Sequence, residues 1–163
     1  SDVTQNQFIR LNMINIALYQ PDIPQNTAAI IRLCSCLGAN LEIIEPCGFR
    51  LDDIKIKRIA MDYLENCKII RHKSIQEFFE IKKKSRIILM TTKANKMYHT
   101  FNFKNRDTIL FGRESKGVPK FIHKKSFKNL KIPMLKNARS LNIATRAAIN
   151  NYEELRQKEF IDD

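Results

Sequence analysis

The apolar residues of this chain are gathered in short runs separated by longer mixed segments. Each run is rich in isoleucine and leucine and is bounded by glycine, proline or polar residues, which is typical of buried strands. These runs predict strands at residues 14–19, 41–45, 67–72, 86–90, 108–111 and 130–133. The mixed segments between them leave room for helices.

Helices are predicted from their start and stop signals. Residues 24–27 supply a proline and polar side chains that suit a first turn, and Gly38 supplies a stop. Ser74 can cap a second helix. Asp53 and Lys57 are an acid and a base four residues apart, which favours a third. The expected helices cover residues 24–37, 52–61, 75–84, 120–125 and 141–157.

Strands that alternate with helices predict the α/β class, with a mostly parallel sheet flanked by helices. Residues 1–11 are polar and irregular, and we expect a disordered extension or an expression remnant there, followed by a single domain over residues 12–163. No apolar run approaches the roughly 20 residues of a membrane span, and the N-terminus lacks a signal-peptide core. We therefore expect a soluble, cytoplasmic protein.

The segment 108–119, TILFGRESKGVP, is the most distinctive stretch. It joins a predicted strand to a loop that contains Gly112 and Gly117, two of the four glycines in the chain. Glycine allows a sharp bend and a close backbone approach, and open α/β sheets bind ligands where strands end in such loops. An ordinary chain-reversing turn is the competing interpretation.

Positive charge is concentrated after this loop. The formal net charge is +12, and between residues 113 and 139 nine basic residues face one acid, Glu114. Such clustering suits a polyanionic partner, with Lys and Arg as phosphate contacts. Genome base composition, or a solvated basic face without a partner, could also account for it.

The sequence motifs of several common ligand sites are absent from this chain. No GxGxxG motif follows the first strand and no GxxxxGK[ST] motif occurs, which removes the main support for dinucleotide and nucleoside-triphosphate sites. The cysteines are spaced neither for a metal nor for a dense disulfide framework, and we expect free, buried thiols. We expect no metal, because the three histidines are scattered and read as surface or structural residues. The cysteines are Cys34, Cys36, Cys47 and Cys67, and the histidines are His72, His99 and His123.

Three motifs together resemble the SPOUT class of RNA methyltransferases. They are NTAAIIRLC (residues 26–34), ILFGRESKGVP (residues 109–119) and IPMLKNARSLNIA (residues 132–144). The stretches LYQPDIPQN and IIEPCGF make the chain most similar to the small enzymes that 2'-O-methylate the wobble nucleotide, cytidine 34 or modified uridine 34, of tRNA. The resemblance covers about residues 12–157.

This resemblance implies a C-terminal trefoil knot, S-adenosylmethionine bound in the knot, tRNA bound through its anticodon loop, and an active site shared across a homodimer. General topology rules would argue against a knot, since knotted folds are rare. Matching positions imply cofactor contacts at Met90, Gly112, Ile132 and Ser140. For Met90 and Ile132 plain core packing is compatible with that role, because the expected contacts are made by the backbone.

The resemblance also implies catalytic or site-organising roles for Asn26, Arg32, Glu114 and Asn142. Arg32 is expected near the reacting hydroxyl, either orienting the ribose and its phosphate or donating to the developing oxyanion, since arginine stays protonated. Glu114 could complement the sulfonium, or pair with Asn26 or Arg32.

RNA contacts are expected from Arg139 and Lys116. The chain departs from the family pattern at Ala28 and Ala29, where glycine and asparagine are common, at Arg113, and after Asn142. The catalytic positions are retained, so we expect activity.

Other functions remain possible at this level. They are a basic RNA-binding module that has lost catalysis, a 2'-O-methyltransferase acting at another tRNA or rRNA position, and, more distantly, a nucleotide-dependent oxidoreductase.

Overall fold

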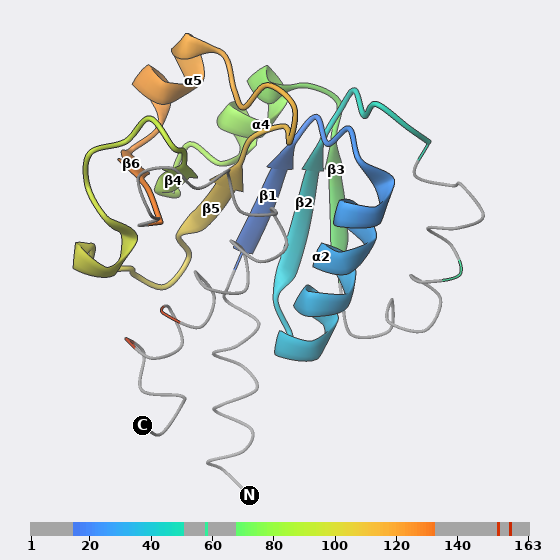
Figure 1. The fold of residues 1–163 in the computed structure, drawn as a ribbon, viewed down its shortest axis with the longest axis horizontal. Helices are drawn as coiled ribbons and strands as arrows, with labels where there is room; N and C mark the ends of the chain where they lie inside the picture. The colour runs from blue at the N-terminus through green and yellow to red at the C-terminus, as the bar shows by residue number, and fades with distance from the viewer. Residues whose placement is uncertain (1–14, 51–57, 59–67, 133–152, 154–156, 158–163) are drawn as a thin grey trace, which may run out of the picture.

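The computed structural model describes residues 15–50, 58, 68–132, 153 and 157 (Figure 1). These residues form an α/β fold in which a six-stranded sheet has the order β3-β2-β1-β5-β4-β6. The strands are β1 (Asn15–Tyr19), β2 (Asn40–Ile44), β3 (Ile69–His72), β4 (Ile87–Met90), β5 (Thr108–Phe111) and β6 (Lys128–Leu130). The helices are α2 (Pro24–Leu37), α4 (Ile75–Ile81) and α5 (Lys120–Lys125), with a 3-10 turn η2 at Tyr98–Thr100.

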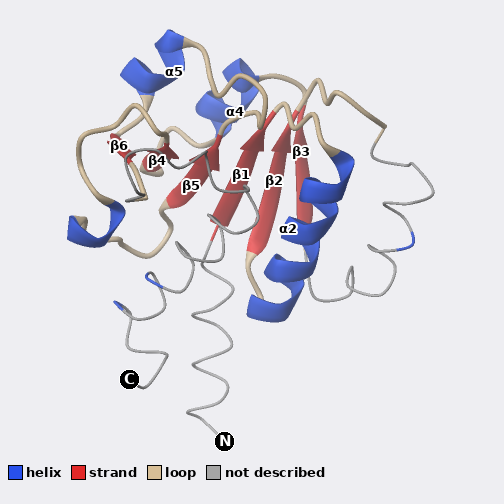
Figure 2. Ribbon diagram, viewed as in Figure 1, coloured by secondary structure: helices blue, strands red, loops and turns tan. Residues whose placement is uncertain are grey.

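Every described strand pairing is parallel, which confirms the predicted class of sheet. β1 lies at the centre, with β2 on one side and β5 on the other. The chain thus runs outward from β1 through β2 to β3, and then returns to build the other half of the sheet. Parallel strands end at the same edge, so the loops after β1, β2, β4 and β5 come together (Figure 2).

The two faces of the sheet carry separate apolar clusters, because successive side chains of a strand point to opposite faces. Ile16 and Leu18 of β1 belong to the cluster that contains Ile30 and Ile31 of α2. The second cluster contains the intervening Ala17 and Tyr19 together with Ile75, Phe78 and Phe79 of α4, and Ile122 of α5. Helices therefore cover both faces, as predicted.

The predicted helix ends are mostly present. α2 begins at Pro24 and stops at Gly38, whose φ of 66° lets its N–H bond the carbonyl groups of the last turn. Ser74 caps α4 through a 3.1 Å hydrogen bond from the Glu77 N–H to its Oγ. The prediction that α4 runs through residues 82–84 is wrong. The helix ends at Ile81, and Lys82 instead reaches Glu42 with its ammonium group, 2.7 Å from Oε2.

The last predicted strand is displaced. Residues 130–133 were the expected range, but β6 begins at Lys128, because the Phe127 N–H donates to the Ile87 carbonyl at 2.8 Å and starts the pairing with β4 there. β6 is an edge strand that pairs with β4 alone, so an exposed lysine is tolerated in it. The turn η2 has no counterpart in the predicted elements.

Two predicted helices fall largely outside the described residues. Of residues 52–61 the structure describes Arg58, and of residues 141–157 it describes Glu153 and Gln157; all three are helical. The Gln157 amide accepts from the Phe103 N–H at 3.0 Å and donates to the Phe101 carbonyl at 2.9 Å. Residues 1–11 also lie outside the described part. No helix in the described part of the chain has the length and apolarity to cross a membrane.

Two buried carboxylates, Glu42 in the sheet and Asp107 just before β5, form ion pairs with partly exposed cations. Glu42 on β2 accepts from His72 Nε2 at 2.8 Å and from Lys82 Nζ at 2.7 Å, so His72 has a structural role. At the opposite end of the strands, Arg86 Nε donates to Asp107 at 2.7 Å, and its guanidinium lies over the ring of Phe101. Both buried carboxylates thus have cationic partners.

Candidate active site

The candidate site lies where the strand order reverses, between β1 and β5. In open parallel sheets, the crevice outside the carboxyl ends of the strands at this point is the usual ligand site. Three loops meet there: residues 20–23 after β1, residues 45–50 after β2, and residues 112–119 after β5.

The loop after β5 is closed by its own backbone. The Arg113 N–H donates to the Gly117 carbonyl at 3.1 Å, and the Gly117 N–H donates back at 2.9 Å. Gly117 has a φ of 64°, and a Cβ on Gly112 would lie 2.8 Å from the carbonyl carbon of Gly117. Both glycines are therefore needed for the sharp bend, as the sequence predicted. The group that approaches Gly112 closely is the backbone of Gly117 in the same loop.

Arg113 is held in place rather than free in solvent. Its Nε donates to the Gly117 carbonyl at 3.0 Å, and its guanidinium carbon lies 5.2 Å from the centroid of the Tyr19 ring. These contacts join the loop after β5 to the end of β1. The guanidinium consequently keeps a defined position at the edge of the crevice.

Glu114 meets a second carboxyl group, that of Asp22. The Asp22 N–H donates to Glu114 Oε2 at 3.2 Å, and the Ser115 hydroxyl donates to Asp22 Oδ2. Burial, followed by the hydrogen bond with Asp22, raises the pKa of Glu114 above its usual value. The hydrogen bond from Glu114 is the main cause that lowers the pKa of Asp22. Glu114 is thus the member of the pair that holds a proton more readily.

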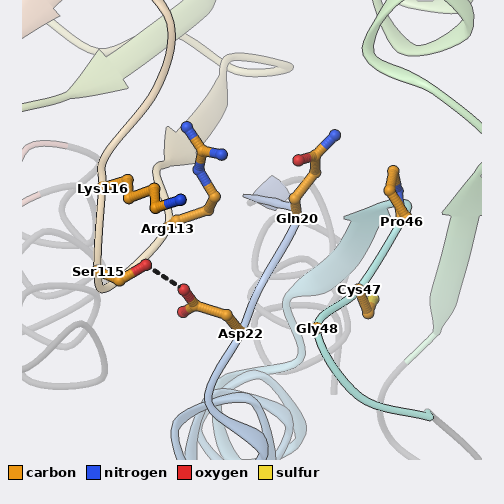
Figure 3. A pocket seen from close by; sticks show the side chains of 8 residues that line it. All are labelled: Gln20, Asp22, Pro46, Cys47, Gly48, Arg113, Ser115 and Lys116. Carbon is orange, nitrogen blue, oxygen red and sulfur yellow. Dashed lines mark hydrogen bonds between the residues drawn. The ribbon is translucent and has the colours of Figure 1, made fainter.

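A pocket of about 280 Å³ opens beside this carboxyl pair (Figure 3). Arg113 and Lys116 bring positive charge to it, and among its lining residues the Ser115 hydroxyl donates to Asp22. The lining residues are Gln20, Asp22, Pro46, Cys47, Gly48, Arg113, Ser115 and Lys116. Burial raises the pKa of the Cys47 thiol to about 11, so Cys47 stays protonated near pH 7 and is a poor nucleophile.

The predicted catalytic and RNA-binding residues that the structure describes lie on two elements, the loop after β5 and helix α2. Glu114 and Lys116 lie together on the loop that Gly112 begins. Asn26 is half-buried in the first turn of α2, and Arg32 is exposed two turns further along the same helix. The contacts described for Glu114 are with Asp22, whereas the sequence suggested Asn26 or Arg32.

The predicted cofactor positions Met90 and Ile132 lie near the ends of neighbouring strands. Met90 is the last residue of β4, opposite Phe111 of β5 and Leu130 of β6. Gly112 and Ile132 follow shortly after those two partners, so the three predicted positions share one edge of the sheet. Ile132 also packs against the core, as expected. Arg139, Ser140 and Asn142 lie outside the described residues.

Sequence reasoning missed Gln20 and Asp22. Both stand in the stretch LYQPDIPQN, which contributed to the resemblance as a whole but gave neither residue a role. The available signal was weak: two polar side chains in the short loop that follows a buried strand. In the described part of the chain, Cys34, Cys36 and Cys47 form no disulfide bond, and no group of three potential ligands could hold a metal ion. Cys34 is buried as expected, but the expectation of a buried thiol is wrong for Cys36, which lies on the exposed side of α2.

Comparison with known proteins identifies the family. The sequence model of the SpoU rRNA Methylase family matches residues 13–152. The chain belongs to this family. A tRNA (cytidine(34)-2'-O)-methyltransferase of Beijerinckia indica is 44% identical over 144 residues, covering 87% of this chain and 90% of that protein. The enzyme of the same name from Escherichia coli is 37% identical over 147 residues, covering 89% and 94%.

Solved structures of SpoU-type enzymes have the same fold. A structure concerned with 2-OH methylation of C/U34 on tRNA superposes with a TM-score of 0.86, at 35% identity, and covers 91% of this chain and 98% of that chain. The SpoU methyltransferase AviRb of Streptomyces viridochromogenes, solved with AdoMet, is 23% identical with a TM-score of 0.80, covering 91% of this chain and 58% of its own, and supports the fold alone. The family resemblance predicted from the motifs is confirmed.

Proposed function

We propose that this chain methylates the ribose 2'-oxygen of the wobble nucleotide 34 of tRNA, with S-adenosylmethionine as methyl donor. The observation that carries the proposal is the similarity along almost the whole chain to enzymes of that name. The strand-end crevice, with its carboxyl pair and adjacent cations, supplies chemistry that suits such a reaction.

The donor site that we propose uses the ends of β4, β5 and β6. Met90, Gly112 and Ile132 combine apolar side chains with nearby peptide groups, a combination that fits an adenosine moiety. Ser140 would add a hydroxyl group. Bound S-adenosylmethionine supplies an electrophilic methyl group on a sulfonium. The chain's contribution is to hold the ribose hydroxyl in line with that group.

We assign Glu114 as the general base that accepts the proton of the 2'-hydroxyl group. When bound, S-adenosylmethionine would supply the methyl group to which the 2'-oxygen bonds, and its sulfur would keep the electron pair of the broken carbon–sulfur bond. The hydroxyl proton passes to the Glu114 carboxylate, whose raised pKa brings it nearer the range useful for a general base. Arg32 orients the ribose and its phosphate, or donates to the developing negative charge on oxygen, and Asn26 and Asn142 organise the site.

The RNA is held by cations beside the site. Lys116 lines the pocket, and α5 and β6, which follow its loop in the chain, carry the exposed Lys120, Lys124, Lys125 and Lys128. Arg139 would extend this set of cations toward anticodon phosphates. A positive surface next to the crevice fits a substrate bound through its backbone.

The trefoil knot and the homodimer belong to the same proposal. We expect the C-terminal segment to form the knot, and a second copy of the chain to complete the site around the exposed Arg32. Light scattering should then give twice the monomer mass of 19.1 kDa. A monomer that is fully active at assay concentration would contradict a shared site.

The decisive experiment is incubation with labelled S-adenosylmethionine and tRNA, followed by mapping of the modified nucleoside. Methylation at another nucleotide, or in rRNA, would overturn the assigned substrate. Thermal stabilisation by S-adenosylmethionine separates an active enzyme from a module without a donor site, since a ligand that prefers the native state must stabilise it. Stabilisation by NAD instead would favour an oxidoreductase.

Arg32→Ala tests the catalytic assignment. We expect transfer to fall about 100-fold, because a misplaced ribose loses its in-line geometry. Calorimetry should find donor binding unchanged. Lys84→Ala, an exposed cation in the turn before β4, is the matched control and should retain wild-type turnover. Full turnover in the Arg32 variant would contradict the mechanism while leaving the family intact.

A further inference from the structure

The pocket at the ends of β1 and β2 is separate from the edge assigned to the methyl donor. Its walls come from the loops after β1, β2 and β5, whereas the donor positions lie after β4, β5 and β6. The loop 113–117 stands between the two. Whatever occupies the pocket therefore lies beside the donor, on the other side of the Glu114 loop.

The size and charge of the pocket restrict its occupant. Its volume of about 280 Å³ is at the lower limit of ordinary ligand sites, which suits one nucleotide-sized fragment rather than the whole donor. Arg113 and Lys116 on one wall match a phosphate group. Asp22 and Gln20 offer a carboxylate and an amide, which suit the polar edge of a base.

Gln20 is held in an unusual backbone conformation. Its φ is 42°, in the left-handed region that glycine and asparagine favour. The conformation is fixed by a 2.8 Å hydrogen bond from the Gln20 N–H to the Ile44 carbonyl. A glutamine in such a backbone conformation points to a role for its side chain, which lines the pocket (Figure 3).

The pocket is also preformed. A Cβ on Gly48 would lie 3.0 Å from Asp22 Cα, and the Gly48 N–H donates to the Pro21 carbonyl at 3.0 Å, so the loops after β1 and β2 are in direct contact. The opposite wall is the closed loop that Gly117 and Arg113 form. Loops already held in place lower the ordering cost of binding.

We propose that this pocket is a nucleotide subsite for the RNA substrate, with Lys116 and Arg113 on a phosphate and Gln20 on the edge of the base. The proposal rests on the proposed function, because it takes the pocket as part of the same substrate-binding surface. It adds a contact that selects for the nucleotide in the pocket beyond attraction to the RNA backbone.

The first test measures affinity for an RNA hairpin with the sequence of a tRNA anticodon arm over a range of salt concentrations. Lys116→Ala should weaken binding several-fold and reduce the slope of log affinity against log salt by about 0.7, the value for one contact to a single-stranded phosphate. Lys84→Ala controls for the loss of one charge and should leave the slope unchanged. An equal change in both variants would overturn the phosphate contact.

The second test is Gln20→Gly. Glycine adopts the left-handed backbone without a clash from Cβ, which offsets the chain entropy that it adds to the unfolded state, so the melting temperature should hold or rise. Affinity for the hairpin should nevertheless fall about tenfold, with the salt slope unchanged. Unchanged affinity in this stably folded variant would overturn the base contact.

Substrate variants identify which nucleotide occupies the pocket. Hairpins that are abasic at position 34 or at one of its neighbours are bound to the wild type and to Gln20→Gly. At the position whose base occupies the pocket, removing the base and replacing Gln20 together should lower the affinity no more than either change does alone. Additive losses at every position would overturn the subsite. Failure of the proposed function is distinguishable, since wild-type protein would then not methylate the intact hairpin.

Discussion

Glu42 and Glu114 are carboxylates of one sheet in opposite surroundings. Glu42 lies inside the sheet with a side chain 3% exposed, and accepts from both His72 and Lys82. Glu114 lies at the strand ends, half-buried, and its described partner is another acid, Asp22. The first carboxylate has its charge compensated by neighbours, whereas the second has its ionisation opposed by them. Glu42 thus stabilises the centre of the sheet, whereas for Glu114 at its edge we propose a role in the reaction.

The largest effect is expected from a substitution at Glu42, and it is an effect on stability. Glu42→Gln removes the charge between His72 and Lys82, and loss of one partner from a buried ion pair costs about 3 kcal/mol in the free energy of unfolding. Urea denaturation measures it. Methyl transfer per folded molecule should be unchanged.

The exposed pair of Lys83 and Glu80 is the control for this measurement. Its side chains are 64% and 75% exposed, so Glu80→Gln should change stability by about 0.3 kcal/mol. A loss at Glu42 as small as this would show that His72 and Lys82 do not compensate its charge.

The next effect is expected at Glu114, and it is an effect on rate. Glu114→Gln keeps a donor for Asp22 but removes the proton acceptor, so transfer should fall about 100-fold. Single-turnover kinetics with saturating donor measures the chemical step. The melting temperature should stay close to that of the wild type, in contrast to Glu42→Gln. A fall in stability without a loss of rate would reverse the roles that we assign to the two carboxylates.

The smallest effect concerns pH. Asp22→Asn removes the second cause that raises the pKa of Glu114 and leaves burial, the largest cause, in place. The pKa of Glu114 should move toward its ordinary value, so the acid limb of kcat/KM should move to lower pH. Glu80→Gln, which removes a distant exposed carboxylate, should leave the limb in place. An unmoved limb in Asp22→Asn would mean that the pair does not share its proton in the free enzyme.

Stability in the same variant should depend on pH with a definite sign. Folding lowers the pKa of Asp22, so its contribution is present above its unfolded pKa and is lost as the pH falls through the folded pKa. Folding raises the pKa of Glu114, so that contribution is present at low pH and is lost as the pH rises through its folded pKa. Asp22→Asn should therefore be most destabilising at a pH between the folded pKa of Asp22 and that of Glu114, and the difference should shrink both in stronger acid and toward neutral pH.

The elements that the sequence predicted best have strong local signals. β5 matches residues 108–111 because four buried residues end at a glycine, and α5 matches residues 120–125 because Pro119 precedes it. β6 was displaced because its polar residues KNL pair at the sheet edge, where the apolar pattern is weak. Local patterns therefore determine central elements better than edges.

The candidate site could be predicted only in part. Glu114 and Lys116 were found through the motif around the glycines. Asp22 was missed because its partner is 92 positions away along the chain, and nothing local to either residue announces the contact. The same holds for Gln20, whose importance lies in a backbone angle and a shared pocket.

The central position of β5 next to β1 has a consequence for biosynthesis. β1, β2 and β3 leave the ribosome long before β5, and during that interval one hydrogen-bonding edge of β1 has no strand beside it. The nascent chain consequently carries an open, apolar strand edge that invites wrong pairing. Enzymatic competence arises only when that gap is filled, so the gain of activity during refolding reports on closure of the whole sheet.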